Sequence, residues 1–255
     1  MIGVDPSVFI GQYAFRHVPH PDPEVLVRVL DRERIERAWV GYLPTVHHRD
    51  PSPGNAELQR LLKPWRTRLA AAPVIRPDYP QWEKALDSAA SEGAAAIRAW
   101  PSHWRMAADD LRLRDLALAC GSRRLPLVLT VRLEDIRQRH PLDTAGDLSA
   151  ATVRSLARAG DGARLIVCAA GKDFIEEVHW GLTPAEQRRV VWDISWIWGP
   201  PEDHLAKLLR TIGEARLVYG TQWPLRLTQS PAANIELLPD DVARPVFADP
   251  SKLFD

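Results

Sequence analysis

Two polar residues near the end of an apolar segment could carry acid–base chemistry. Asp193 and Ser195 are two residues apart in segment 189–196, so a β-strand would place both side chains on one face. A carboxylate held in a pocket can serve as a general acid or base. The alternative is structural, because Asp193 could equally form an ion pair with Arg98 or Arg132.

A glutamine stands in the stretch RLVYGTQWPL (216–225), directly after an apolar run. Gly220 and Pro224 flank the polar pair Thr221 and Gln222, which indicates that a turn follows the strand. A glutamine amide donates and accepts hydrogen bonds, but it cannot take up a proton near neutral pH. Gln222 therefore indicates binding at this position, where a carboxylate would have indicated proton transfer.

Arginine and tryptophan side chains also lie at segment ends or in the connections that follow. Arg98 and Arg132 could hold a carboxylate-bearing ligand through paired hydrogen bonds. Several tryptophans could form the wall of a pocket or a protein interface, and packing beneath a loop is the alternative. These tryptophans are Trp100, Trp104, Trp196, Trp198 and Trp223. Further candidate ligand contacts at segment ends are Ser7, Phe9 and Thr130.

The elements that would position these side chains alternate between two patterns. Apolar runs predict buried parallel strands at 3–10, 37–43, 72–76, 94–100, 125–131, 164–170, 189–196 and 216–222. Amphipathic spacing predicts helices at 22–37, 54–70, 80–92, 107–119, 149–159, 171–178, 201–213 and 226–238. Eight such pairs predict an α/β fold, a single (β/α)8 TIM barrel domain over residues 1–255, with function at the C-terminal strand ends. A doubly wound sheet is the alternative, but its glycine-rich loop does not follow the first strand.

Composition narrows the range of partners. The chain has 33 basic and 33 acidic residues, which argues against a nucleic-acid-binding or membrane-binding face. Two cysteines, Cys120 and Cys168, are too few for a disulfide framework and fit a reducing compartment. Neither a signal-peptide pattern nor an apolar stretch of about 20 residues is present. We expect a cytoplasmic protein with a small-molecule ligand, and a protein partner or a homo-oligomer stays open.

Six motifs are spread over most of the chain. They are VDPSVFIG (4–11), EGAAAIRAWPS (92–102), LPLVLTV (125–131), VVWDIS (190–195), RLVYGTQWPL (216–225) and PVFADPSKLFD (245–255). Together they resemble the strand motifs and closing helix of the amidohydrolase superfamily. The similar branch contains amidohydrolase-related barrels that act as metal-dependent hydrolases and nonoxidative decarboxylases. The Trp-Pro pair after the eighth strand is the most distinctive match.

The resemblance implies a divalent metal at the strand ends, but the matched positions have changed. The two first-strand histidines of the family fall on Ser7 and Phe9, the fifth-strand histidine on Thr130, the sixth-strand histidine on Ala169 or Ala170, and the eighth-strand aspartate on Gln222. A catalytic zinc needs about three protein ligands and one open position. None of these residues is a strong ligand, so the comparison implies a barrel that has lost its metal centre, and we expect no metal and no other cofactor.

Histidines in two connections could in principle rebuild a metal site. His47 and His48 lie in segment 43–54, and His103 lies in segment 100–110. Adjacent histidines on a loop point in different directions, and the chain has no His-x-His or Cys-x-x-Cys pattern. We therefore interpret these histidines as solvated loop residues.

Two classes of function follow from this reading. The first is a non-catalytic ligand-binding or partner subunit, in which Asp193 and Gln222 are remnants of a degenerate site. The second is a metal-independent hydrolase or lyase, of decarboxylase or lactonase type, acting on a small carboxylate-bearing substrate. In that case arginines would anchor the substrate, and Asp193 or a loop histidine would transfer protons. The loss of every matched ligand favours the first class.

Overall fold

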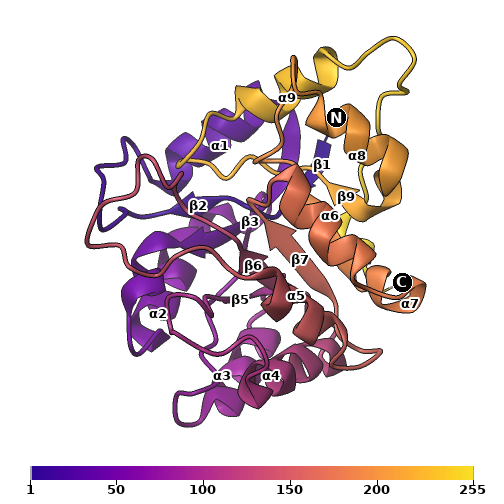
Figure 1. Ribbon diagram of the computed structural model, residues 1–255. Helices are drawn as coiled ribbons and strands as arrows, with labels where there is room; N and C mark the ends of the chain where they lie inside the picture. The colour runs from indigo at the N-terminus through magenta and orange to yellow at the C-terminus, as the bar shows by residue number, and fades with distance from the viewer. Residues whose placement is uncertain (1, 255) are drawn as a thin grey trace.

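Parallel strands in the middle of the molecule are surrounded by helices (Figure 1) in the computed structural model, which describes residues 2–254. The strands are β1 (Ile2–Asp5), β2 (Phe9–Ile10), β3 (Ile35–Tyr42), β4 (Leu69–Ala71), β5 (Ile97–Ala99), β6 (Leu127–Thr130), β7 (Leu165–Cys168), β8 (Val190–Asp193) and β9 (Leu217–Val218). The helices are α1 (Pro23–Arg32), α2 (Ser52–Leu62), α3 (Trp82–Ser91), α4 (Leu111–Ser122), α5 (Ala150–Ala157), α6 (Lys172–Trp180), α7 (Pro184–Gln187), α8 (His204–Thr211) and α9 (Gln229–Glu236). Within residues 2–254, no helix has the length and apolar character needed to cross a membrane.

The strands close into a barrel. Both β1 and β2 pair with β3, so they form one barrel strand that is interrupted at residues 6–8. A parallel bridge between Val74 and Arg98 joins the β1–β4 ladder to the β5–β9 ladder. On the other side, Phe9 N–H donates to the Trp223 carbonyl at 2.8 Å. The result is the predicted (β/α)8 barrel, with loops after each strand at the C-terminal end, here called the mouth.

Local signals explain where the first helix begins and ends. Asp22 caps α1 by accepting the Val25 N–H at 3.0 Å, and Pro23 occupies the first turn, where its missing N–H has no consequence. The predicted helix 22–37 is too long, because β3 already begins at Ile35. A left-handed backbone at Arg34, with φ of 57°, ends the helical path before that strand.

The third barrel strand lies earlier than predicted. The apolar run 72–76 follows β4 and does not form it, and Val74 makes only the bridge to Arg98. Pro73 lacks the N–H that a central strand donates to its neighbour, which explains why the regular ladder ends before it.

The barrel interior contains two layers of side chains. The lower layer is apolar and consists of Val4, Trp39, Ala72, Ala96, Val128, Ile166, Val191 and Val218. Val128 and Val218 belong to this cluster, so both side chains point into the barrel. Because side chains alternate along a strand, the residues two positions later face the same interior. This upper layer contains Gly41, Arg98, Thr130, Cys168, Asp193 and Gly220.

Candidate ligand site at the barrel mouth

The Arg98 guanidinium is buried inside the barrel, where it binds main-chain carbonyl groups. Its side chain is only 1 % exposed. Its Nη2 donates to the carbonyls of Pro6 at 2.7 Å and of Val8 and Trp39 at 3.3 Å. The guanidinium carbon lies 4.5 Å from the centre of the Phe9 ring. The structure therefore does not present Arg98 to a ligand, in contrast to the expectation that it anchors a carboxylate.

Aromatic rings cover the interior above β5. The Phe9 and Trp100 rings lie 6.0 Å apart, and Trp100 contacts His103 edge-on at 5.8 Å. Both ring nitrogens of His103 are buried without a hydrogen-bond partner, and burial lowers the pKa of His103 to about 4. The interpretation of His103 as a solvated residue is therefore wrong. Phe9 and Trp100, which the sequence suggested as ligand contacts, are buried in this part of the barrel.

Asp5 joins the first and last barrel strands. One carboxylate oxygen accepts the Ser7 N–H and hydroxyl, both at 2.9 Å, and the other accepts the Thr221 N–H at 3.1 Å and hydroxyl at 2.7 Å. Burial raises the pKa of Asp5, and these hydrogen bonds act in the opposite direction. The Gln222 N–H donates to the Ser7 hydroxyl at 3.0 Å, so the first and last strands bring these two candidate site residues together.

Asp193 is a buried carboxyl group with one free oxygen. Its Oδ1 accepts the Ala169 N–H at 2.8 Å, and its Oδ2 makes no hydrogen bond of good geometry within residues 2–254, although the Ser195 and Ser7 hydroxyls lower the pKa of this carboxyl. Burial raises the pKa of Asp193 to about 6. Among residues 2–254, neither Arg98 nor Arg132 forms an ion pair with it, so that expectation is not met. Arg132 instead pairs with Asp147 at 2.8 Å.

Gln222 is held in an unusual conformation at the end of β9. Its backbone has a left-handed φ of 54°, and its side-chain Nε2 donates to the Arg132 carbonyl at 2.7 Å. Its Oε1 and the Ser195 hydroxyl are buried and make no hydrogen bond of good geometry with any residue from 2 to 254. Thr130 is buried nearby at the end of β6. These expected site residues therefore lie at the mouth, beneath its surface.

An arginine and two indoles stack beside this buried centre. The Arg226 guanidinium carbon lies 4.0 Å from the Trp196 ring centre and 5.8 Å from that of Trp198. Arg132 approaches the same Trp196 ring at 5.4 Å. Trp196 is buried, whereas Trp198 is 43 % exposed. The stack orients the Arg226 guanidinium at the edge of the mouth.

Arg226, Trp196 and Trp198 line a cavity of about 500 Å³, here called the flank cavity. Its walls come from the connections after β2, β6, β8 and β9. Two of its arginines have carboxylate partners, since Arg16 pairs with Glu134 and Arg137 pairs with Asp135, both at 2.9 Å. Within residues 2–254, Arg226 has no such partner. The volume is within the usual range for small-molecule sites.

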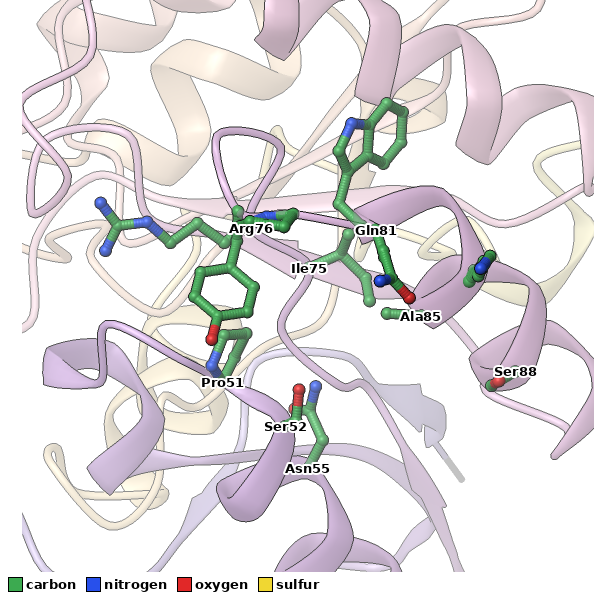
Figure 2. Close-up of a pocket in the computed structure, with 12 residues that line it drawn as sticks. Pro51, Ser52, Asn55, Ile75, Arg76, Gln81, Ala85 and Ser88 are labelled. Carbon is green, nitrogen blue, oxygen red and sulfur yellow. The ribbon is translucent and has the colours of Figure 1, made fainter.

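Another cavity, of about 430 Å³, lies between α2 and α3 (Figure 2). Asn55 from α2 and Ala85 from α3 contribute to its walls. Its arginine is already paired, because Arg76 makes two bonds to Asp78 at 2.7 and 3.0 Å. The Asn55 amide is likewise bound to the Val74 backbone at 2.7 and 2.9 Å. Arg76 and Asn55 are therefore engaged within the chain, and Lys84 is the other cation of the lining.

Solved structures match the chain over nearly its whole length, although no family model matches it and no curated protein matches its sequence. A 2,6-dihydroxybenzoate decarboxylase in complex with 2,6-dihydroxybenzoate has a TM-score of 0.69 at 11 % identity, covering 95 % of this chain and 93 % of that one. A dihydroxybenzoic acid decarboxylase from Polaromonas with bound manganese has a TM-score of 0.67 at 13 % identity, covering 99 % and 94 %. An amidohydrolase from Burkholderia multivorans with bound zinc has a TM-score of 0.62 at 14 % identity, covering 92 % and 90 %. The fold is that of the amidohydrolase barrels.

The matched metal-ligand positions of this amidohydrolase-like barrel do not fit a metal. Phe9, Ala169 and Ala170 have no side-chain donor atom. The Ser7 hydroxyl is engaged by Asp5 and by the Gln222 N–H, and the Gln222 side chain offers only a neutral amide oxygen, which is a weak ligand. Among residues 2–254, no three or more histidine, cysteine, aspartate or glutamate side chains group closely enough to hold a metal ion. We therefore derive no metal-dependent step for this site.

Sequence reasoning missed residues that the structure makes important. Asp5, Gly41 and Gly220 could have been found by counting two positions along each strand or by examining the first motif. Nothing in the sequence separates Arg226 from the other arginines. Its importance comes from the tryptophans of the β8 connection, which only the fold brings beneath it.

Proposed function

We propose that this amidohydrolase-like barrel is a ligand-binding protein without metal-dependent hydrolysis, and that it holds a small carboxylate-bearing molecule in the flank cavity. The observation that carries the proposal is Arg226, stacked at 4.0 Å on Trp196 and free of any carboxylate among residues 2–254. A planar guanidinium binds a carboxylate through two parallel hydrogen bonds, and the indole sets its orientation in advance.

The electrostatics of the flank cavity support an anionic ligand. Burial lowers the pKa of Arg226, and Asp193 and Asp135 act in the opposite direction. A partly buried cation without a partner is unfavourable, so a bound carboxylate would offset that cost. The cavity walls carry three arginines against two carboxylates, which leaves one positive charge in excess. The exposed faces of Trp198 and Leu227 suit an apolar part of the ligand.

The centre of the mouth supports binding over catalysis. Ser7, Asp193 and Gln222 are fully buried, and each makes at least one side-chain bond to another part of the chain, so none of them faces solvent. A role as the partner subunit of another protein, or as one copy in a homo-oligomer, is compatible with a ligand held at the flank.

One observation favours a second function, a metal-independent hydrolase or lyase. Asp193 has a pKa of about 6 and an Oδ2 without a partner, which are the properties of a general acid or base near neutral pH. This function would need the mouth to open, since no part of Asp193 reaches solvent.

Calorimetric titration of 2,6-dihydroxybenzoate and citrate into the protein tests the proposal. Arg226→Met should weaken binding by about 10-fold or more, because a charged hydrogen-bond pair is lost. Arg137→Met is the matched control in the same cavity, where Asp135 already neutralises the arginine, and it should change the affinity by less than about threefold. Equal affinity in wild type and Arg226→Met would refute the flank site.

A turnover assay on the same two probes, after chelator treatment, separates the two functions. We expect no turnover. Activity that survives the chelator and disappears in Asp193→Asn would establish the metal-independent enzyme instead, because a general base contributes about 10²–10⁴-fold.

A further inference from the structure

A cavity of about 500 Å³ lies on the outside of the barrel wall and is here called the tail cavity. Its walls come from β1, from Tyr219 directly after β9, from α9 and from segment 244–249. It shares no lining residue with the flank cavity. The proposed function therefore makes no use of this space.

The absence of a side chain at Gly3 provides part of the space. Val4 and Val218 point into the barrel as members of the lower layer, so the alternation of side chains directs position 3 and Tyr219 outward, toward the tail cavity. A Cβ atom at Gly3 would meet no atom within 4 Å. A larger residue at this position would therefore extend into the cavity.

The wall opposite β1 is held in place by contacts with the last strand. The Ala248 N–H donates to the Leu217 carbonyl at 3.0 Å. The Phe247 ring contacts the Tyr219 ring edge-on, with 5.8 Å between the ring centres. These contacts fix segment 244–249, so the cavity is already formed without a ligand, as is usual for small-molecule sites.

The lining of the tail cavity is mostly apolar and has no excess of positive charge. Its charged residues are Arg244, Glu236 and Asp249. The Asp249 carboxylate already accepts the Ser251 N–H at 2.9 Å and the Ser251 hydroxyl at 2.7 Å. In contrast to the flank cavity, these charges do not favour an anion. The apolar wall residues are Ile2, Val4, Ala232, Ile235, Pro245, Val246, Phe247 and Ala248.

One buried polar group of this wall lacks a partner. Tyr219 is only 1 % exposed, and its hydroxyl makes no hydrogen bond of good geometry within residues 2–254. Burial raises the pKa of Tyr219, so the hydroxyl stays protonated and can donate. A buried donor without an acceptor is unfavourable, and a bound acceptor would remove that cost.

We propose that the tail cavity binds a neutral, mostly apolar molecule that carries a hydrogen-bond acceptor such as a ketone or ester oxygen. The apolar walls contact the body of the molecule, which occupies the space beside Gly3. The Tyr219 hydroxyl donates to its acceptor. The tail cavity differs from the flank cavity in its residues and in the charge of its ligand, so this inference does not depend on the proposed function.

A fluorescence titration with prodan, a neutral naphthalene ketone, tests the site. Wild type should bind prodan saturably, and Gly3→Phe should weaken binding by at least about 10-fold, because the added ring occupies the cavity. Gly162→Phe is the matched control, since a Cβ atom at Gly162 also meets no atom within 4 Å but Gly162 does not line the cavity. It should change the affinity by less than about twofold.

Two outcomes of this titration would overturn the proposal. They are the absence of saturable binding to wild type, and equal affinity in wild type and Gly3→Phe. Arg226→Met should leave the affinity for prodan within about twofold of wild type, and a larger loss would place prodan in the flank cavity instead.

Tyr219→Phe tests the acceptor and keeps the proposal falsifiable if Gly3→Phe does not fold. The variant removes only the unpartnered hydroxyl, so it should fold, and it should bind prodan about three- to tenfold more weakly through the lost hydrogen bond. Because hydrogen bonding to its ketone shifts prodan emission to longer wavelength, the bound probe should emit at shorter wavelength in Tyr219→Phe. Unchanged affinity and emission would refute the role of Tyr219.

Discussion

The two inner layers of the barrel come from the same strands, at positions two residues apart, and they differ in the polarity of their side chains. The lower layer contains only apolar side chains that pack against one another. The upper layer contains charged and polar groups, among them Asp193 and Arg98, with buried atoms that lack hydrogen-bond partners. Close apolar packing stabilises a fold, whereas unpartnered polar atoms weaken it. The lower layer therefore maintains the barrel, and the upper layer keeps a polarity that stability alone does not explain.

The largest expected change in the free energy of unfolding comes from the titration of Asp193 in the upper layer. Its pKa rises from 3.8 to about 6 in the folded chain, so folding favours the protonated form. This pKa shift adds to the free energy of unfolding, and the contribution is fully present below about pH 4. It is lost as the pH rises through 6, and the total loss is on the order of 3 kcal/mol.

Urea unfolding of wild type and Asp193→Asn between about pH 4 and pH 8 measures this loss. The free-energy difference between the two proteins should move against wild type as the pH rises, and it should level off above about pH 7. A difference that does not vary with pH would show that the upper layer leaves Asp193 unperturbed.

Truncation in the lower layer should cost nearly as much. Val128→Ala and Val218→Ala each remove buried methyl groups and leave a cavity, at about 2–3 kcal/mol of unfolding free energy. Val246 is 78 % exposed, so Val246→Ala is the control and should change stability by less than about 0.5 kcal/mol. Denaturant midpoints measure both, and a similarly small effect at Val128 would contradict the packed lower layer.

Gly220 allows a third test, which measures how closely the upper layer is packed. A Cβ atom at Gly220 would lie 2.5 Å from Asp193 Oδ2 and 2.8 Å from the Ser7 hydroxyl. Gly220→Ala should therefore destabilise the protein by about 2 kcal/mol through overpacking. Combining it with Asp193→Ala should relieve part of that loss, as measured by urea unfolding. No relief would mean that Asp193 is not the obstructing group.

The smallest expected changes in stability come from two buried serines, which differ in whether the hydroxyl group is hydrogen-bonded. The Ser7 hydroxyl donates to Asp5 and accepts the Gln222 N–H, so Ser7→Ala should cost about 1–2 kcal/mol. The Ser195 hydroxyl lies near the Asp193 carboxyl and lowers its pKa, but it makes no hydrogen bond of good geometry among residues 2–254, so Ser195→Ala should change stability by less than about 0.5 kcal/mol. Equal losses in thermal unfolding would place Ser195 in a hydrogen-bonded network after all.

Local patterns were sufficient to predict much of the fold. The apolar and amphipathic segments predicted the eight strand–helix pairs. The displaced third strand and the early end of α1 were missed, because Pro73 and the left-handed Arg34 act on element boundaries, where periodicity is least informative.

The arginines show why the site was harder to predict than the fold. Arg98 and Arg132 appeared as equivalent anchors because each follows an apolar segment. In the structure, Arg98 is held by three carbonyls and Arg132 is paired with Asp147, whereas Arg226 has no carboxylate partner within residues 2–254. Whether an arginine has a hydrogen-bond or ion-pair partner depends on residues far away in the sequence, so the neighbouring residues cannot reveal it.

The sequence by itself determined the alternation of strands and helices, the likeness to amidohydrolase barrels and the absence of strong ligands at the matched positions. These properties depend on residue type and short-range spacing, which can be read directly from the sequence. Only the tertiary structure decided that Arg98 enters the space left by Gly41, that Asp193 is buried with one free oxygen, and that Arg226 stacks on Trp196. Closing the barrel brings β1, β3, β5 and β9 around one interior, and this proximity decides which polar groups are paired and which remain available.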